Sequence, residues 1–222
     1  MLDPERLHRA YATARDALIR ERVAEGYWVG ELSSSALSTA TAVSALAVVA
    51  GSAEGASQGR DALDRLILAG AGWLAGRQNA DGGWGDTDKS VSNISTTMLA
   101  CAALQLAGAG RKDDDALARG QRYVEREGGV PAIRRRYGKD KTFSVPILTN
   151  AALAGMVDWS EVAPLPFELA CLPQGIWGVV RLPVVSYAIP ALVAIGQARF
   201  VQRPPSSAVV RWLRRRAVPR AL

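Results

Sequence analysis

Residues 77–85 read Arg-Gln-Asn-Ala-Asp-Gly-Gly-Trp-Gly and combine two glycines with a glutamine and a tryptophan. Gly82 and Gly83 permit backbone conformations that other residues rarely adopt. Trp84 offers a large apolar surface and an indole N–H, and Gln78 can bond free backbone groups at helix ends. We therefore predict a structural turn that fixes one helical hairpin to the next. A glycine loop that binds a sugar or phosphate is the alternative, but the lysine and preceding strand of a P-loop are missing.

The same turn occurs twice in the sequence. Gly26-Tyr27-Trp28 aligns with Gly82-Gly83-Trp84 at a shift of 56 residues, and Thr41 then aligns with Thr97. Each copy reads as a helix, a Gly-x-Trp turn and a second helix. Such hairpins stack because they cannot bury their apolar faces alone. The repeat predicts an all-α fold of stacked helical hairpins, with Gln78, Gly83, Trp84, Gly26 and Trp28 as its structural motif.

Helical periodicity extends over most of the chain. Asp3 and Pro4 predict the start of a first helix, which should end near Gly26. We expect a loop over residues 128–143, several short helices between the prolines of 160–200, and no strand. The remaining helices are predicted over 34–50, 60–78, 95–108, 113–127, 144–157 and the basic C-terminal segment 203–222.

Composition limits the class of protein. The 222 residues, 49% of them hydrophobic, suffice for one domain over 1–222 with a sizeable core. Cys101 and Cys171 lie in apolar stretches, so we expect two buried thiols without a disulfide, which fits a cytoplasmic location. His8 is the single histidine, which excludes a multi-histidine metal site. Residues 36–50 are too short to span a membrane.

The net charge of +6 is concentrated in two arginine clusters, residues 134–136 and 211–220. Such clusters attract phosphate groups of nucleic acids or of anionic lipids, and a solvated helix end is the alternative. Binding of nucleic acid is not predicted, because Trp212 is the lone aromatic residue among these arginines.

The spacing of Gln78, Gly83 and Trp84 resembles the QW repeat of triterpene cyclases. The stretches GYWVGEL (26–32) and GGWGDTDKSVSNISTTMLACAAL (82–104) are similar to N-terminal segments of squalene-hopene cyclases. The resemblance implies a partial α-α barrel, or toroid, on a membrane face. It further implies a polyprenyl hydrocarbon substrate such as squalene, ring closure started by protonation of a terminal double bond, and no cofactor or metal.

The sequence departs from that family in its acid. The family's Asp-x-Asp-Asp-Thr-Ala motif belongs to a second domain, and this chain does not contain it. The run Asp113-Asp114-Asp115 lacks the threonine and is interpreted as a helix start. We therefore assign no catalytic residue and expect the chain to be inactive alone. The family lines its cavity with aromatic residues, and here the corresponding candidates are Phe143 and Tyr187.

Three functions remain open. The first is an N-terminal domain or fragment of a squalene-hopene-type cyclase, peripheral on the cytoplasmic membrane face, with anionic lipid and the rest of the enzyme or a second domain as partners. The second is a non-catalytic lipid-binding or membrane-associated helical module. The third, a relative of protein prenyltransferase β-subunits, needs Asp, Cys and His zinc ligands, which a single histidine disfavours. A membrane-facing plateau and a packed core are both compatible with the apolar residues Leu165, Phe167, Ile176, Trp177, Val179 and Val180.

Overall fold

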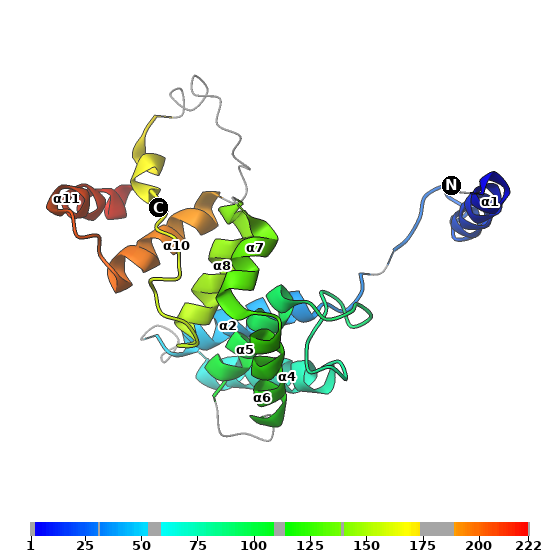
Figure 1. The fold of residues 1–222 in the computed structure, drawn as a ribbon, viewed down its shortest axis with the longest axis horizontal. Helices are drawn as coiled ribbons and strands as arrows, with labels where there is room; N and C mark the ends of the chain where they lie inside the picture. The colour runs from blue at the N-terminus through cyan, green and yellow to red at the C-terminus, as the bar shows by residue number, and fades with distance from the viewer. Residues whose placement is uncertain are drawn as a thin grey trace. The chain divides into compact units, whose positions relative to one another are not determined.

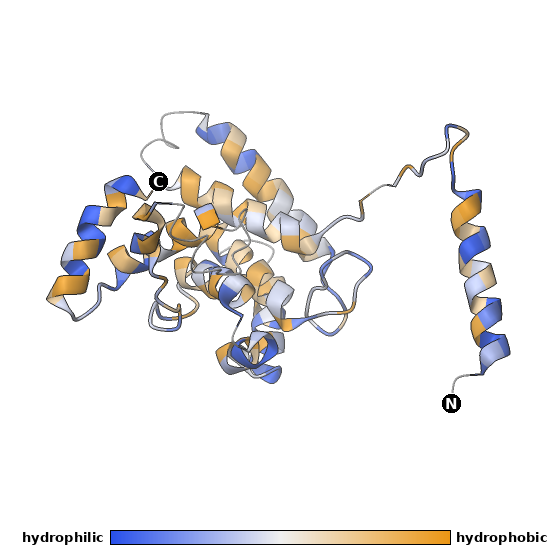
Figure 2. Cartoon of the chain, turned by 90° about the horizontal axis from the view of Figure 1, so that it is seen from above, coloured by the Kyte–Doolittle hydropathy of each residue, from blue (hydrophilic) through white to orange (hydrophobic). Residues whose placement is uncertain are grey.

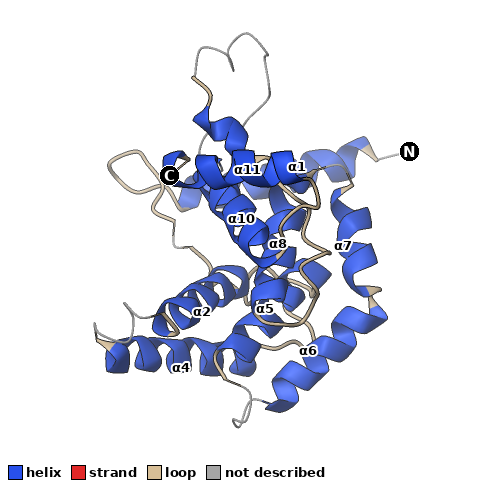
Figure 3. Ribbon diagram, turned by 90° about the vertical axis from the view of Figure 1, so that its left-hand side faces the viewer, coloured by secondary structure: helices blue, strands red, loops and turns tan. Residues whose placement is uncertain are grey.

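The computed structural model describes residues 3–30, 32–52, 59–108, 114–138, 140–173 and 189–221. Within these ranges every regular element is a helix, which confirms the predicted all-α fold (Figure 3). The β-type pairing in these ranges is an isolated antiparallel bridge between Arg22 and Trp28. The chain divides into two compact units, residues 1–34 and 35–222, which are described one at a time.

Unit 1 consists of helix α1 (Pro4–Arg20) and the turn that follows it. The predicted start is confirmed: the Asp3 carboxylate accepts a hydrogen bond from the Glu5 N–H at 3.0 Å, and Pro4 occupies the first turn. The predicted end near Gly26 is wrong, because the chain leaves the helix at Arg20. Gly26, with φ of 90°, lies instead at the corner of the turn.

Unit 2 is built around helix α5 (Ile94–Leu106), which contacts helices on several sides (Figure 1). Every residue from Ile94 to Leu104 is buried, as expected for a helix without a polar face. Asn93 caps it by accepting a hydrogen bond from the Thr96 N–H at 3.0 Å. Apolar residues gather where these helices pack together (Figure 2). The helices in contact with α5 are α2 (Ala36–Ala50), α4 (Arg60–Gly76), α6 (Asp114–Arg126), α7 (Gly129–Tyr137) and α8 (Lys141–Leu153).

The predicted loop over residues 128–143 is wrong, because most of it forms α7 and the start of α8. Gly128, with φ of 98°, begins α7 in a left-handed conformation, and Gly138, with φ of 55°, ends it. Ile133 lies between them and is completely buried. The glycines therefore mark the two ends of a short helix. Its last turn contains Arg134, Arg135 and Arg136.

The C-terminal part of unit 2 has its own small core, formed by Phe167, Val193, Phe200 and Ala217. In the described part of this region, Pro166 immediately precedes the short helix η1, and Pro190 lies in the first turn of α10. Two of the proposed plateau residues are not exposed: Phe167 is buried, and Leu165 packs against the larger core. The elements are η1 (Phe167–Cys171), α10 (Ile189–Gln202), α11 (Ala208–Ala217) and η3 (Val218–Arg220).

Of the two thiols predicted to be buried, Cys101 is buried and Cys171 is not. Both cysteines are free, but Cys171 is exposed, because its segment is a surface 3-10 helix. The plateau residues Ile176, Trp177, Val179 and Val180 lie outside the described residues. Among the helices described, none is long and apolar enough to cross a membrane.

Candidate functional site

Gln78 joins two helical hairpins at the turn between α4 and α5. Its side-chain amide donates one hydrogen bond to the Gly82 carbonyl at 2.7 Å and another to the Ala116 carbonyl in α6 at 2.8 Å. The first bond closes the turn, and the second connects the turn to the next hairpin. Gln78 therefore uses both amide hydrogens to satisfy backbone acceptors on two separate elements.

Trp84 lies at the centre of the same turn and is completely buried. Its indole N–H donates to the Leu74 carbonyl near the end of α4 at 2.8 Å, and its backbone N–H donates to the Thr97 hydroxyl in α5 at 2.9 Å. The ring packs against α6, where a Cβ on Gly120 would come within 2.7 Å of it. One side chain thus contacts the three helices α4, α5 and α6.

The two glycines of the turn are required for different reasons. Gly82 has φ of 87°, a conformation in which an L side chain is strained. A Cβ on Gly83 would lie 2.6 Å from the Cβ of Ser92 and 2.8 Å from the Tyr123 ring, so here the requirement is space. Gly82 therefore provides the positive φ of the turn, and Gly83 leaves room for Ser92 and Tyr123 to pack against the turn.

Asp81 stabilises the loop that follows the turn by accepting two hydrogen bonds within it. Its carboxylate accepts hydrogen bonds from the Gly83 N–H at 3.0 Å and the Ser92 hydroxyl at 2.7 Å. Burial raises the pKa of Asp81, but these hydrogen bonds and the charge of Arg126 outweigh it, so the net pKa is below the usual value. Asp81 is therefore a carboxylate at neutral pH and a poor proton donor.

Asp86 plays the same part at the start of α5. It accepts hydrogen bonds from the Thr96 hydroxyl at 2.5 Å and the Asn93 amide at 2.9 Å. These two hydrogen bonds lower the pKa of Asp86. Protonating an alkene requires a carboxylic acid that holds its proton, and neither Asp81 nor Asp86 meets that condition.

The turn in unit 1 repeats two of these contacts at the shift of 56 residues. The Trp28 indole N–H donates to the Leu18 carbonyl at 2.6 Å, as Trp84 does to Leu74. Arg22 stands where the other copy has Gln78, and its Nε donates to the Gly26 carbonyl at 2.9 Å. The Arg22 guanidinium also lies over the Trp28 ring, 5.6 Å from its centroid. Sequence comparison alone missed Arg22, although the 56-residue shift places it directly opposite Gln78.

The two copies differ in burial. Trp84 is fully covered, whereas Trp28 is 47% exposed within its own unit. Gln78 also donates a second hydrogen bond, to the Ala116 carbonyl in α6, and among the described residues Arg22 has no corresponding bond to another helix. Within the described part of unit 1, the first turn therefore has the local geometry of the second but no helix that covers its tryptophan.

The other predicted site residues lie apart from these turns. Phe143 is 57% exposed in α8 and stacks on Tyr137, with 5.8 Å between ring centroids. The Tyr137 hydroxyl bonds the Ser95 hydroxyl of α5 at 2.9 Å, a contact that sequence patterns gave no means to foresee. Tyr187 lies outside the described residues. Phe143 therefore stacks on Tyr137, whose hydroxyl contacts the N-terminal end of α5.

Two further groups bear on possible chemistry. Burial raises the pKa of the Cys101 thiol to about 12, so it is not a nucleophile at neutral pH. Asp115 is exposed near the start of α6 and pairs with Arg119 one turn later at 3.2 Å. The described residues include no group of three or more His, Cys, Asp or Glu side chains that could hold a metal ion.

Comparison with known proteins identifies the class. The sequence profile of the squalene-hopene cyclase N-terminal domain matches residues 11–211. An all-helical domain with paired Gly-x-Trp turns that matches this profile over most of its length is a terpene cyclase domain. The chain belongs to the squalene-hopene cyclase family, and its residues 11–211 correspond to the N-terminal domain of that family.

Three curated relatives agree with this assignment. The chain is 36% identical to enfumafungin synthase of Hormonema carpetanum over 103 residues, 46% of this chain and 7% of that protein. It is 30% identical to a terpene cyclase-glycosyl transferase fusion protein of Humicola fuscoatra over 171 residues, 73% of this chain and 11% of that protein. It is 28% identical to a probable squalene–hopene cyclase of Sinorhizobium fredii over 189 residues, 84% of this chain and 25% of that protein. The matches thus span at most a quarter of these relatives, and no solved structure matches the chain.

Proposed function

We propose that this chain contributes one wall of a polyprenyl-hydrocarbon chamber in a terpene cyclase and does not cyclise squalene by itself. The match to the cyclase N-terminal domain over residues 11–211 is the observation that carries the proposal. The turns around Gln78, Gly83, Trp84, Gly26 and Trp28 serve as the structural motif of that wall, since each indole N–H ties its turn to the preceding helix.

The acids in the sequence support the expectation that the chain alone gives no turnover. The chain contains no Asp-x-Asp-Asp-Thr-Ala motif. The lowered pKa values of Asp81 and Asp86 leave both groups ionised at neutral pH. An alkene needs a far stronger and protonated donor. We assign no residue of this chain to proton transfer, and Phe143 and Tyr187 remain candidates for contact with the hydrocarbon.

The test is incubation of the purified chain with squalene in detergent micelles, followed by gas chromatography and mass spectrometry. A complete squalene-hopene cyclase under the same conditions is the positive control. We expect cyclised product with the control and none with this chain. Any cyclic triterpene formed by the chain in excess of a no-protein blank would refute the proposal.

A second domain is the proposed partner of unit 1. In unit 2, Trp84 is covered by α6 and Gln78 bonds to that helix. In unit 1, α1 has no buried residue, and Leu18 and Trp28 remain half exposed within the unit. A helix packed on Trp28 as α6 packs on Trp84 would cover both residues, and we propose that another domain of the cyclase provides it. The test is whether Trp28→Ala abolishes association with that domain while Trp212→Ala does not.

A non-catalytic, membrane-associated module is the second candidate function, and α11 favours it. Val209, Trp212 and Leu213 are exposed on this helix together with Arg215 and Arg216. Exposed apolar residues among arginines fit the interface of an anionic membrane. Co-sedimentation with phosphatidylglycerol vesicles at low and high salt tests this: binding without any product from squalene would favour the module, and no binding would exclude it. The proposed location is peripheral on the cytoplasmic membrane face.

A further inference from the structure

Four arginines line one pocket in the C-terminal part of unit 2. The pocket has a volume of about 470 Å³ and lies between the segment that contains Pro164, the end of α10 and the start of α11. That volume is within the usual range for small-molecule sites, roughly 300–1,000 Å³. The lining residues are Pro164, Arg199, Arg203, Pro204, Pro205, Ser206, Arg211 and Arg214.

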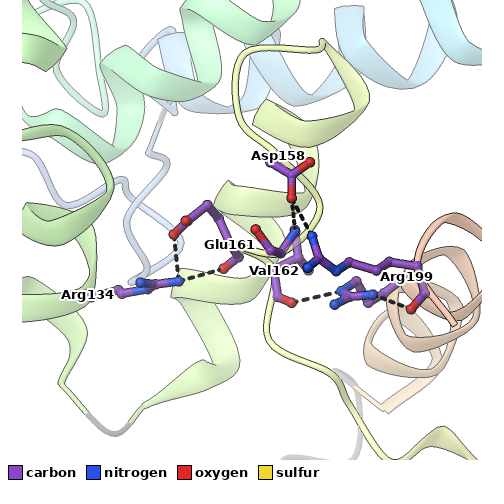
Figure 4. A network of polar contacts seen from close by, with 7 residues as sticks. Arg134, Asp158, Glu161, Val162 and Arg199 are labelled. Atoms are coloured by element: carbon purple, nitrogen blue, oxygen red, sulfur yellow. Dashed lines mark hydrogen bonds and ion pairs between the residues drawn. The ribbon is translucent and has the colours of Figure 1, made fainter. Parts of the chain in front are cut away.

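Two of these arginines are paired with carboxylates. Arg214 is almost completely buried and bonds Glu168 at 3.0 Å, and Arg203 bonds Asp158 at 2.7 Å. The Asp158 turn is held in place from its other side, where Arg134 of α7 pairs with Glu161 at 2.7 Å (Figure 4). Glu168 and Asp158 therefore each already pair with an arginine of the pocket.

The other two arginines have backbone carbonyls as their partners. Arg199 donates from Nε to the Val162 carbonyl at 3.0 Å and from a terminal nitrogen to the Arg203 carbonyl (Figure 4). Arg211 donates to the carbonyls of Pro205 and Ser206. In the part of the chain that the structure describes, neither forms an ion pair, so their charges are not neutralised. A guanidinium has five N–H donors, and each of these arginines has donors left over.

Electrostatic evidence agrees with this geometry. Burial lowers the pKa of Arg199, and the positive charges of Arg203 and Arg214 lower it further while Asp158 opposes them. Cations that repel one another around a cavity gain most from an anion placed between them.

We propose that this pocket is a binding site for a phosphate-class anion, a phosphomonoester or a diphosphate, held by Arg199, Arg203 and Arg211. Guanidinium groups bind such oxyanions through two parallel hydrogen bonds, which matches a pocket lined by several of them. The anion belongs either to a free small molecule or to a lipid head group. The site rests on these residues alone and does not depend on the proposed cyclase function.

The primary test is calorimetric titration of the full chain with sodium pyrophosphate at fixed ionic strength. We expect saturable binding to one site, weakened about tenfold or more in Arg203→Gln and Arg211→Gln, because each variant loses charge-assisted hydrogen bonds. Arg215→Gln is the matched control, since Arg215 is exposed on α11 but does not line the pocket. Its affinity should change less than twofold. No saturable binding, or equal losses in all three variants, would overturn the proposal.

A gain of affinity distinguishes the site from a loss of folding. Asp158→Asn removes the carboxylate that pairs with Arg203 and should tighten pyrophosphate binding severalfold. A variant that misfolds cannot bind more tightly, so weakened or unchanged binding counts against the site.

Vesicles then identify the source of the anion. Phosphatidylcholine vesicles with phosphatidic acid present a phosphomonoester, and those with phosphatidylglycerol at equal surface charge present a phosphodiester. Preference for phosphatidic acid that Arg211→Gln removes and Arg215→Gln retains assigns a lipid head group. Pyrophosphate binding without that preference assigns a free anion. Lack of both contradicts the proposal.

Discussion

Replacing each repeat tryptophan by phenylalanine separates the hydrogen bond of the turn from its burial. Trp84 and Trp28 make the same bond to a helix carbonyl, at 2.8 and 2.6 Å, yet Trp84 is fully buried and Trp28 is 47% exposed. In Trp84→Phe, the Leu74 carbonyl loses its buried partner, which costs about 1–3 kcal/mol. The smaller phenyl ring leaves a cavity that adds about 1–2 kcal/mol. We expect a total of about 2–5 kcal/mol.

The matched variant Trp28→Phe should cost less than about 1 kcal/mol, because water can replace the lost donor at an exposed site. Urea unfolding followed by far-ultraviolet circular dichroism measures both, and it does not depend on the substituted fluorophore. With a slope of roughly 2–3 kcal/mol per molar urea, Trp84→Phe should lower the midpoint by about 1–2 M. Equal shifts in the two variants, or a shift below about 0.3 M for Trp84→Phe, would refute the argument that burial gives this bond its weight.

Three further outcomes follow from the same structure. Gly120→Ala should destabilise unit 2 by about 1–3 kcal/mol, since the new methyl group would lie 2.5 Å from the Cys101 sulfur, whereas Gly72→Ala has open space and should stabilise the helix by about 0.5–1 kcal/mol; urea midpoints decide both. Folding lowers the pKa of Asp86, so this carboxylate stabilises the folded state above the unfolded pKa near 3.9, and the stabilisation is lost as the pH falls through the folded pKa. The urea midpoint should therefore fall less between pH 5 and pH 2 in Asp86→Asn than in the wild type. A thiol reagent at pH 8 should label the exposed Cys171 quickly and Cys101 only after unfolding, and fast labelling of both in the native protein would contradict the packing of α5.

The sequence predicted the helices wherever a local signal coincided with a local cause. Asp3 and Pro4 mark the start of α1, because the cap and the fixed proline torsion act within one turn. The Gly82-Gly83-Trp84 turn was recognisable because its glycines meet one torsional and one steric requirement inside the loop.

The sequence failed where the cause was distant. Gly128 and Gly138 suggested a loop, but burial of Ile133 against the core holds the residues between them in a helix. Phe167 was equally compatible with a membrane plateau and a core until Phe200 and Arg214 were found beside it. The arginine pocket could not be predicted, because residues 164, 199 and 211 meet through tertiary packing and have no shared sequence pattern.

Hydrogen–deuterium exchange of the two turns tests most directly whether the Gln78–Trp84 turn joins α4, α5 and α6 into one wall. The amides of Asn79 and Trp84 bond Gly83 and Thr97 inside the wall, so they should exchange only with unfolding of unit 2. The corresponding Val23 amide bonds Tyr27 in the exposed turn of unit 1 and should exchange much faster. If the amides of Asn79 and Trp84 exchanged as quickly as that of Val23, the turn would not hold the helices together, and the account would be contradicted.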